Sequence, residues 1–391
     1  MSARRTLLEL FDAALRAVDG RVCVRTALRG CDAPLVNVFA IGKAAGRMAL
    51  GARDALGARI AQMLVITKRG HREPALDAAH ILQLEGSHPL PDARSLAHGQ
   101  ALLEAIGRLA PDEFPVFLVS GGSSSLVEAL REGAALEDLV ALNARGLAAG
   151  WDIAKLNAAR VKLSRIKGGG ISRLLGARRA LALFISDVPQ DDPEVIGSGL
   201  LGHGGCADRI ERRVVASIDM AMEAAGHAAL AHGLRLDVRA TRFDGDAAKV
   251  AREFLEALRA TPADGLIWGG ESTVELPERT GRGGRNTHLA LAAARLLRAD
   301  ESLTLLAAGT DGTDGPTDDA GAIVDGGSVQ RAELAGCDVE RAWQEFDSGA
   351  ALEAAGDLVH TGPTGTNVGD LLIGIRRSAN SLRGRDVPLV L

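Results

Sequence analysis

Short apolar runs alternate with stretches of helical periodicity along most of this chain. Six runs, each ending in a glycine-rich or acidic loop, begin the blocks 35–49, 61–71, 114–130, 180–199, 265–276 and 302–315. The apolar positions in them are not strictly alternating, which is typical of strands buried on both faces. Helical patterns at Leu96–Leu109, Ile153–Ser164, Val214–Ala231 and Asp246–Leu258 separate many of these runs. This alternation predicts an α/β fold with a mainly parallel sheet.

The length of the chain, 391 residues with 47% hydrophobic, exceeds the size at which a single core usually stops growing. We therefore expect two domains, with the boundary in the polar stretch 232–246, and we assign residues 1–236 and 237–391. The second half has its own strand and helix patterns and ends in a strand at the tail of block 360–375.

The N-terminal segment "MSARRTLLELFDAALRAV" has Leu and Phe at helical spacing and carries Glu9 and Asp12, so it predicts a docked amphipathic helix and not a targeting peptide. No run of about 18 uncharged apolar residues is present, so we expect no membrane span and a cytoplasmic location. The net charge of −5 argues against general binding to nucleic acid or to a membrane surface.

The four cysteines, Cys23, Cys31, Cys206 and Cys337, form no C-x-x-C pair. His203 lies near Cys206, but no second ligand pair completes a zinc pattern. We interpret the cysteines as small buried residues in a reducing compartment.

An acidic loop follows the apolar run 303–308: Gly309 to Gly321 holds four aspartates and four glycines. Carboxylates at the carboxyl end of a strand can hold a cation beside a ligand. The spacing does not fit an EF-hand, whereas magnesium held by one or two carboxylates and substrate phosphates fits better. Asp311 and Asp314 are therefore candidates for metal or substrate binding, as is Glu271 in "GGESTVEL"; a solvated turn is the alternative for the acidic loop.

The stretch "SGGSSSL", residues 120–126, follows a strand pattern and begins a helix pattern. Backbone N–H groups at such a position bind anions, so Gly121, Gly122, Ser123 and Ser124 are candidates for phosphate binding. The stretch is not a Walker A loop, and a serine N-cap is the alternative.

Lys43 in "AIGKAAGRM" also lies just after a strand, where a helix begins. A lysine there opposes the positive helix end, which an anionic ligand would explain. The neighbouring Gly42 and Gly46 do not make a dinucleotide fingerprint, and a surface lysine is the alternative.

Asp187, at a strand end in "FISDVPQDDP", is a candidate general base or magnesium ligand, with a turn-forming role as the alternative. Arg285 in "GRGGRNTHLAL" can bind a carboxylate or phosphate through two hydrogen bonds, with a solvated helix start as the alternative. The stretch "NAARVKLSRIKGGG" predicts a helix with cations near its end and a glycine C-cap, in preference to a phosphate site. These cations are Arg160, Lys162, Arg165 and Lys167.

Nine blocks of the chain, taken in order, resemble those of the glycerate 2-kinase family, also called the MOFRL family. They are "FAIGKAAGRMA", "VITKRGH", "EGSHPLPD", "LVSGGSSSL", "LSRIKGGGIS", "ISDVPQDDPEVIGSG", "GGESTVELPERTGRGGRN", "AAGTDGTDGPTDDAGAIVD" and "HTGPTGTNVGDLLI". The resemblance covers about residues 35–375. Some members of this family carry the name hydroxypyruvate reductase.

The resemblance implies an ATP-dependent kinase that converts D-glycerate to 2-phosphoglycerate with a divalent metal, taken as Mg²⁺. It implies a larger Rossmann-like domain, a smaller α/β domain and an active site in the cleft between them. Lys43 and Arg285 match the functional pair of the family. A homodimer is left open.

In the resulting hypothesis, Lys43 neutralises the transferred phosphate, and the loop at 121–124 cradles phosphate oxygens. Arg285 clamps a carboxylate or phosphate. Asp187 takes the C2 hydroxyl proton or holds Mg²⁺, and Asp311 and Asp314 hold metal or substrate hydroxyls. Domain closure would exclude water.

The sequence departs from the family pattern at Leu200–Leu201, Thr287–His288, in "LNAARVKLS" and in "FDSGA", which bears on the substrate more than on the reaction class. The alternatives are an NAD(P)H-dependent hydroxypyruvate reductase, which the missing G-x-G-x-x-G disfavours, a kinase for a related small hydroxy acid, and a non-enzymatic sugar-acid sensor.

Overall fold

The structure of the protein is a computed structural model that describes residues 2–149, 153–203, 209–277, 280–298, 300 and 302–376. The chain folds into two compact units. The unit that contains residues 18–217 and 365–368 is called the parallel unit below, and the unit that contains residues 1–17, 218–364 and 369–391 is called the mixed unit. Each is described by itself.

The parallel unit is built on a sheet of six strands in the order β3-β2-β1-β4-β5-β6, and every neighbouring pair is parallel. The strands are β1 (Val36–Ile41), β2 (Ile60–Lys68), β3 (Ile81–Gly86), β4 (Phe114–Val119), β5 (Arg179–Ile185) and β6 (Arg209–Ala216). The chain builds outward from β1 in one direction, then returns to β4 and builds outward in the other. A doubly wound sheet of this order has its switch point between β1 and β4.

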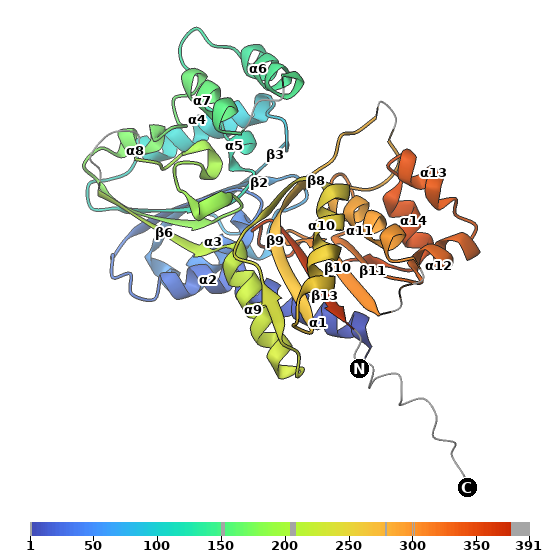
Figure 1. The fold of residues 1–391 in the computed structure, drawn as a ribbon. Coiled ribbons are helices and arrows are strands. Elements are labelled where there is room, and N and C mark those ends of the chain that lie inside the picture. Colours follow the sequence, from blue (N-terminus) through green and yellow to red (C-terminus); the bar gives the residue numbers. More distant parts are fainter. Residues whose placement is uncertain are drawn as a thin grey trace. The chain divides into compact units, whose positions relative to one another are not determined.

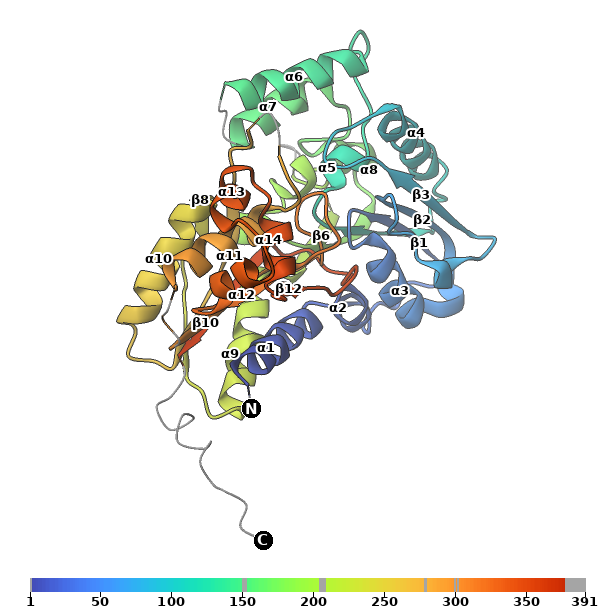
Figure 2. The ribbon, with the colours of Figure 1, turned by 90° about the vertical axis from the view of Figure 1, so that its right-hand side faces the viewer.

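Helices cover both faces of the parallel sheet (Figure 2). Helices α2 (Gly20–Ala27) and α3 (Ala45–Leu56) pack together on one face, and α4 (Ala93–Gly107) lies on the other. The remaining helices of this unit are α5 (Ser123–Leu126), α6 (Leu136–Ala148), α7 (Ile153–Leu163) and α8 (Gly170–Leu175). Because both faces are covered, β1 is buried along its whole length, as its continuous apolar run predicts.

The core of the parallel unit is apolar and closely packed. The rings of Phe39 on β1 and Phe117 on β4 stack with centroids 4.9 Å apart, and Phe184 on β5 is fully buried beside them in the same cluster. Stacked rings of this kind contribute about 0.5–1.5 kcal/mol beyond their buried area. The core therefore holds the carboxyl ends of β1 and β4 in a fixed register, with Ile41 opposite Val119.

The mixed unit is built on a sheet in the order β12-β11-β10-β13-β9-β7, with β8 also paired to β9. The strands are β7 (Leu236–Val238), β8 (Phe243–Asp246), β9 (Gly265–Thr273), β10 (Leu303–Gly309), β11 (Gly321–Asp325), β12 (Leu358–Val359) and β13 (Asp370–Arg376). Strands β9 and β10 both run antiparallel to β13, so their carboxyl ends meet the amino end of β13 at one edge of the sheet.

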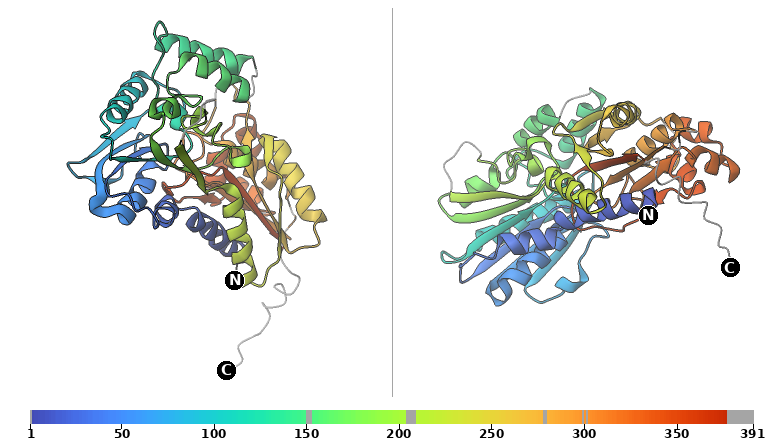
Figure 3. Two further views of the ribbon diagram at one scale, coloured as in Figure 1. Left: turned by 90° about the vertical axis from the view of Figure 1, so that its left-hand side faces the viewer. Right: turned by 60° about the horizontal axis from the view of Figure 1, so that its bottom comes forward.

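Helices cover both faces of this sheet as well (Figure 3). Helices α1 (Ala3–Ala17) and α9 (Ile218–Ala231) lie together on one face, and α10 (Ala247–Ala260) and α11 (Arg285–Leu296) lie on the other. The unit is completed by α12 (Ser328–Leu334), α13 (Val339–Gln344) and α14 (Ser348–Ala354). The C-terminal block ends in strand β13, and the N-terminal amphipathic segment forms α1, as expected.

The division of the chain differs from the single boundary expected at residue 236 (Figure 1). Helix α1 belongs to the mixed unit because it buries Leu7, Leu10 and Phe11 and packs on α9, β10 and β13. Helix α9 joins the same unit, and its expected start at Val214 is wrong because β6 extends to Ala216. Chain order alone does not reveal that the N-terminus returns to a later sheet.

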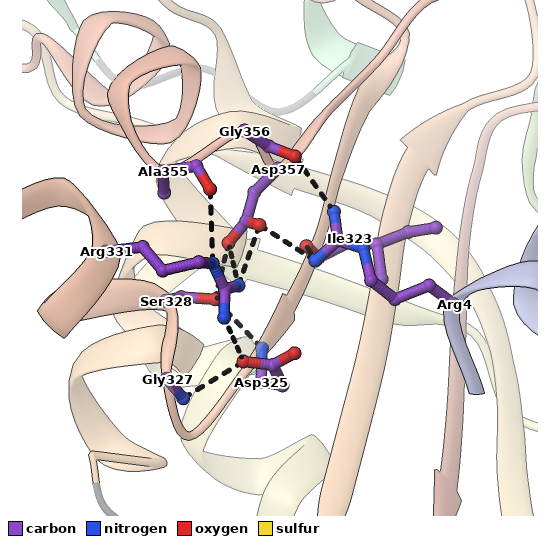
Figure 4. Close-up of polar contacts among 9 residues, drawn as sticks. All are labelled: Arg4, Ile323, Asp325, Gly327, Ser328, Arg331, Ala355, Gly356 and Asp357. Atoms are coloured by element: carbon purple, nitrogen blue, oxygen red, sulfur yellow. Dashed lines mark hydrogen bonds and ion pairs between the residues drawn. The ribbon is translucent and has the colours of Figure 1, made fainter. Parts of the chain in front are cut away.

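A polar network also connects α1 to the mixed unit (Figure 4). Arg4 forms an ion pair of 2.7 Å with Asp357, whose side chain is 1% exposed, and donates to the carbonyl of Ile323. Arg331 binds the same carboxylate and also Asp325. One buried carboxylate thus receives two guanidinium groups, which ties the first helix of the chain to β11 and α12.

None of the helices in the described ranges is both long and apolar enough to cross a membrane. Cys23, Cys31 and Cys337 are free thiols that are partly buried and not fully buried as expected, and burial raises the pKa of Cys23 to about 11. Cys206 lies outside the described residues.

Candidate active site

Two loops meet at the switch point of the parallel sheet. The loop after β1 carries Gly42 and Lys43. The loop after β4 carries Ser120 to Ser124 and is called the glycine–serine loop below. The amide N–H of Lys43 donates to the carbonyl of Gly121 at 2.9 Å, and Ala44 N–H donates to Ser120 Oγ at 3.1 Å. The sequence reasoning predicted each loop separately, and the structure brings them together at the position where open α/β sheets bind ligands.

Glycine is required at the centre of this junction. Gly42 has φ of +129°, and a Cβ there would lie 2.2 Å from Ser120 Oγ. Gly122 is left-handed with φ of +81°, and a Cβ there would come within 2.9 Å of the His88 ring and 3.2 Å of Lys43 Cγ. The side chain of Lys43 therefore passes close to Gly122, and its role in phosphate binding stays a prediction.

Ser123 and Ser124 begin the short helix α5. The Oγ of Ser123 is buried and has no hydrogen-bond partner among the described residues, whereas Ser124 Oγ lies 2.7 Å from Ser198 Oγ. A buried hydroxyl without a partner costs free energy, and such a group is expected where a ligand completes the site.

Asp187 follows β5 and comes close to the same loop. Its Oδ2 accepts a hydrogen bond from Asn367 Nδ2 at 3.1 Å. A Cβ on Gly121 would lie 1.9 Å from that oxygen and 2.0 Å from the amide nitrogen. The close packing of the pair against Gly121 places a carboxylate next to the predicted phosphate loop.

Asn367 was not among the predicted site residues. It belongs to the segment 365–368, which returns from the C-terminal part of the chain into the parallel unit. The block "HTGPTGTNVGDLLI" that contains it was recognised, but its position after a long excursion through the mixed unit hid its contact with Asp187.

The predicted residues of the mixed unit gather at the edge where β9, β10 and β13 meet. Arg285, the first residue of α11, forms ion pairs with Asp370 at 2.5 Å and with Glu271 at 2.7 Å. Burial would lower the pKa of Arg285, but Asp370 and Glu271 outweigh it and raise the pKa. Arg285 is thus already held by two carboxylates, one of them, Asp370, missed by the sequence reasoning.

Asp314 is almost fully buried and caps helix α11. Its Oδ1 accepts the N–H of Asn286 at 2.9 Å, and its Oδ2 accepts the N–H of Thr287 at 2.7 Å and the hydroxyl of Thr287 at 2.8 Å. Burial raises the pKa of this carboxyl group, and the N–H donors partly offset the rise. This geometry favours helix capping over the predicted metal or substrate role, because both oxygens are already in use.

Asp311 follows β10 and is 8% exposed. Its Oδ1 accepts the N–H of Thr313 at 3.0 Å and the hydroxyl of Thr313 at 3.1 Å, which is an Asx turn. The turn interpretation therefore applies to one oxygen of Asp311, and the predicted role in binding a metal or substrate stays a prediction.

No group of three or more His, Cys, Asp or Glu side chains in the described part of the chain is arranged to hold a metal ion. Magnesium bound to a nucleotide needs only one or two carboxylates, because phosphates and water supply the other oxygens. The predicted roles of Asp187 and of Asp311 as oxygen donors to such an ion stay predictions.

The sequence predicts that residues 157–170 form a helix that ends in a glycine C-cap, and the structure differs. Helix α7 ends at Leu163, and Lys167 lies beyond it, 1% exposed, in an ion pair of 2.5 Å with Glu128. The prediction was wrong because the partner carboxylate lies 39 residues earlier, where no local pattern indicates it.

His288, at a position where the sequence departs from the family pattern, is stacked between two rings. Its ring lies 4.0 Å from Trp343 and 4.3 Å from Phe346, and the guanidinium of Arg295 lies over Trp343. Burial, and then the charge of Arg295, lower the pKa of His288 to about 4 against the opposing effect of Asp246. His288, where the sequence departs from the family pattern, is therefore part of the packed core between α11 and α13.

The fold and the loops define a class of protein: a two-unit α/β protein with a glycine- and serine-rich loop at the switch point of a doubly wound parallel sheet. Residues 6–227 match the model of a domain of unknown function (DUF4147), and residues 265–370 match the MOFRL family model. The chain belongs to the glycerate 2-kinase, or MOFRL, family.

Relatives over nearly the full length agree with this family. The chain is 33% identical to the D-glycerate 2-kinase of Thermotoga maritima, covering 96% of this chain and 98% of that protein. It is 31% identical to the glycerate 2-kinase of Pyrococcus horikoshii, covering 98% and 99%. The crystal structure of glycerate kinase from Thermotoga maritima matches with a TM-score of 0.83 at 32% identity, over 95% of this chain and 99% of that one.

Proposed function

We propose that this protein is an ATP-dependent kinase that phosphorylates the C2 hydroxyl of D-glycerate and releases 2-phosphoglycerate. The similarity to D-glycerate 2-kinases over almost the whole chain supports the reaction. The observation that carries the proposal is the junction of the Lys43 loop with the glycine–serine loop at the switch point of the parallel sheet.

The roles follow from the chemistry of phosphoryl transfer, which depends on positioning and on neutralising charge. Lys43 lies along the loop 121–124 and neutralises the transferred phosphoryl group. The backbone N–H groups of that loop, with the hydroxyl of Ser123, bind phosphate oxygens.

Asp187 has two roles open to it. Its carboxylate accepts the proton of the C2 hydroxyl, or it holds Mg²⁺, and Asn367 orients it for either task. Mg²⁺ would neutralise phosphate charge when bound, and Asp187 and Asp311 are the carboxylates proposed to hold it. Arg285, Glu271 and Asp311 of the mixed unit are proposed to serve the same reaction.

The test is ADP release by the purified protein with ATP, Mg²⁺ and D-glycerate. Adding enolase without phosphoglycerate mutase or pyruvate kinase reports the position of the new phosphate, because enolase makes phosphoenolpyruvate from 2-phosphoglycerate only. Rapid phosphoenolpyruvate formation supports the proposal. ADP release without phosphoenolpyruvate would favour another hydroxyl or a related hydroxy acid.

The alternative is a hydroxypyruvate reductase that uses NAD(P)H. The loop after β1 reads "GKAAG" and lacks the glycine turn that usually binds the pyrophosphate of such cofactors. Consumption of NADH with hydroxypyruvate, in the absence of ADP release from ATP and glycerate, would replace the kinase proposal with this one.

A further inference from the structure

A cavity of about 230 Å³ lies beside the glycine–serine loop, within the parallel unit. Its wall includes Gly122 and Ser124 from the loop, His88 after β3, and three side chains from the region of α6 and α7: Asn143, Arg160 and Lys167. Nothing in the sequence reasoning assigned this cavity, because its residues come from four separate segments.

The cavity has more positive than negative side chains. Lys167 and Glu128 form a buried pair, and the second oxygen of Glu128 accepts hydrogen bonds from Ser164 Oγ and from the N–H of Ala129. Arg160 has no carboxylate within ion-pair distance among the described residues. The set of Arg160, Lys167 and Glu128 thus carries one uncompensated positive charge.

The guanidinium of Arg160 is oriented by neutral groups. Its Nε donates to Asn143 Oδ1 at 2.9 Å, and one terminal nitrogen donates to Asn157 Oδ1 at 3.3 Å. Burial lowers the pKa of Arg160, and the charge of Glu128 opposes this. Within the described residues the other terminal nitrogen has no partner, so a partly desolvated cation presents unused N–H donors.

Lys167 also has donor capacity left. Its Nζ carries three N–H bonds, and one partner, Glu128 Oε2, is present in the described part of the chain. Two cationic groups that line one small cavity with donors to spare are suited to the two or three oxygens of a carboxylate or a phosphate.

Arg160 is further tied to the glycine–serine loop. Asn157 Oδ1, which binds Arg160, also accepts the hydroxyl of Ser198 at 3.0 Å, and Ser198 Oγ lies 2.7 Å from Ser124 Oγ. Ser198 is held in the left-handed region with φ of +58°, which is unfavourable for a serine. This chain of contacts fixes the distance between Arg160 and the loop.

We propose that this cavity is an oxyanion subsite of the active site, in which Arg160 and Lys167 bind a carboxylate or phosphate group of a substrate. The inference rests on the proposed function for the identity of the substrates. A cavity of 230 Å³ admits a three-carbon hydroxy acid but not a whole nucleotide. The oxyanion is therefore the carboxylate of the acceptor or a phosphate group that projects from the nucleotide.

The experiment measures equilibrium binding of D-glycerate and of ATP, each alone, by titration calorimetry. It compares the unmodified protein with two variants. Arg160→Gln removes the charge, whereas Arg160→Lys keeps the charge but loses the planar guanidinium group and its fixed set of N–H donors. The control is Arg165→Gln, an exposed arginine of the same segment outside the cavity wall. Thermal unfolding of each variant checks that it folds.

We expect Arg160→Gln to weaken one of the two ligands about 10- to 100-fold, the range for a lost charged hydrogen bond, with a smaller loss for Arg160→Lys. The control should bind both ligands as the unmodified protein does. A loss confined to glycerate identifies the carboxylate as the occupant, and a loss confined to ATP identifies a phosphate.

Unchanged affinity of both Arg160 variants for both ligands would overturn the proposal, as would a protein that binds neither ligand. A protein that binds an anion through Arg160 but releases no ADP would remove the proposed function and keep the subsite. Normal ADP release with a normal KM in Arg160→Gln would remove the subsite and keep the proposed function.

Discussion

The loops at the carboxyl ends of β1 and β4 differ in one instructive respect from those at the ends of β9 and β10. The first pair, in the parallel unit, is made of glycine, serine and Lys43, and leaves the buried hydroxyl of Ser123 without a partner in the described residues. In the mixed unit, the loop after β10 holds four aspartates, yet one of them, Asp314, is occupied by N–H groups and a hydroxyl of α11. Residue charge along the sequence is therefore a poor guide to which groups are available to a ligand.

Arginines of the two units show the same difference. Arg285 of the mixed unit is bound by Asp370 and Glu271, so its charge is compensated within the protein. Arg160 of the parallel unit is bound by the amide oxygens of Asn143 and Asn157, which orient it without cancelling its charge. Of these two arginines, Arg160 of the parallel unit is accordingly the one better suited to bind an anion.

The substitution with the largest expected effect is Lys43→Ala, which tests whether the loops of the parallel unit bind the transferred phosphate. If Lys43 neutralises the transferred phosphoryl group, kcat should fall about 100- to 1,000-fold, as for the loss of one preorganised electrostatic group in other active sites. Steady-state ADP release measures the effect. Lys249→Ala, which removes an exposed lysine of α10, is the control and should keep kcat unchanged. Full turnover in Lys43→Ala would remove this residue from the mechanism.

The second substitution, Gly121→Ala, tests the contact of the loop with Asp187 and Asn367. A Cβ at this position would lie within 2.0 Å of both side chains, so the pair must move away from the loop. We expect kcat to fall by about 100-fold, because a displacement of about 1 Å has this effect on positioning. Gly107→Ala is the matched control, since nothing lies within 4 Å of its Cβ, and it should leave kcat unchanged.

The third test concerns pH and the aromatic stack of the mixed unit. The pKa of His288 is about 4 in the folded protein, below its ordinary value of 6.5, so the unfolded chain binds more protons between these values. The free energy of unfolding should therefore fall as pH drops from 6.5 towards 4, by on the order of 3 kcal/mol. Denaturant unfolding at several pH values measures it.

The matching variant is His288→Phe, which keeps a ring between Trp343 and Phe346 but cannot be protonated. Its unfolding free energy should depend less steeply on pH over the same interval. Identical pH dependence in both proteins would assign the effect to other groups.

The smallest expected effect comes from Asp314→Ala in the acidic loop. The loss of the cap on α11 should lower the free energy of unfolding by about 1–2 kcal/mol. The apparent affinity for Mg²⁺ in the ADP-release assay should stay unchanged, whereas Asp187→Ala should weaken it. A large loss of Mg²⁺ affinity in Asp314→Ala would restore the predicted metal role and erase the difference between the two units.

The sequence by itself determined the fold class and the location of the candidate loops. Continuous apolar runs identified β1, β4, β5, β9 and β10, because strands covered on both faces need apolar side chains at successive positions. Ordered motifs indicated the family, which the full-length relatives confirm. Lys43 and the glycine–serine loop were identified from local signals, since strand, glycine and helix start all lie within a few residues of one another.

The tertiary structure alone decided which of the polar residues are already in use. The pairing of Lys167 with Glu128, of Asp187 with Asn367, and of Arg285 with Asp370 joins residues 39, 180 and 85 positions apart. It also decided that α1 belongs to the last sheet of the chain. Local periodicity reports which face of an element is buried, but the free energy of an ion pair or hydrogen bond depends on a partner brought close only by the complete fold.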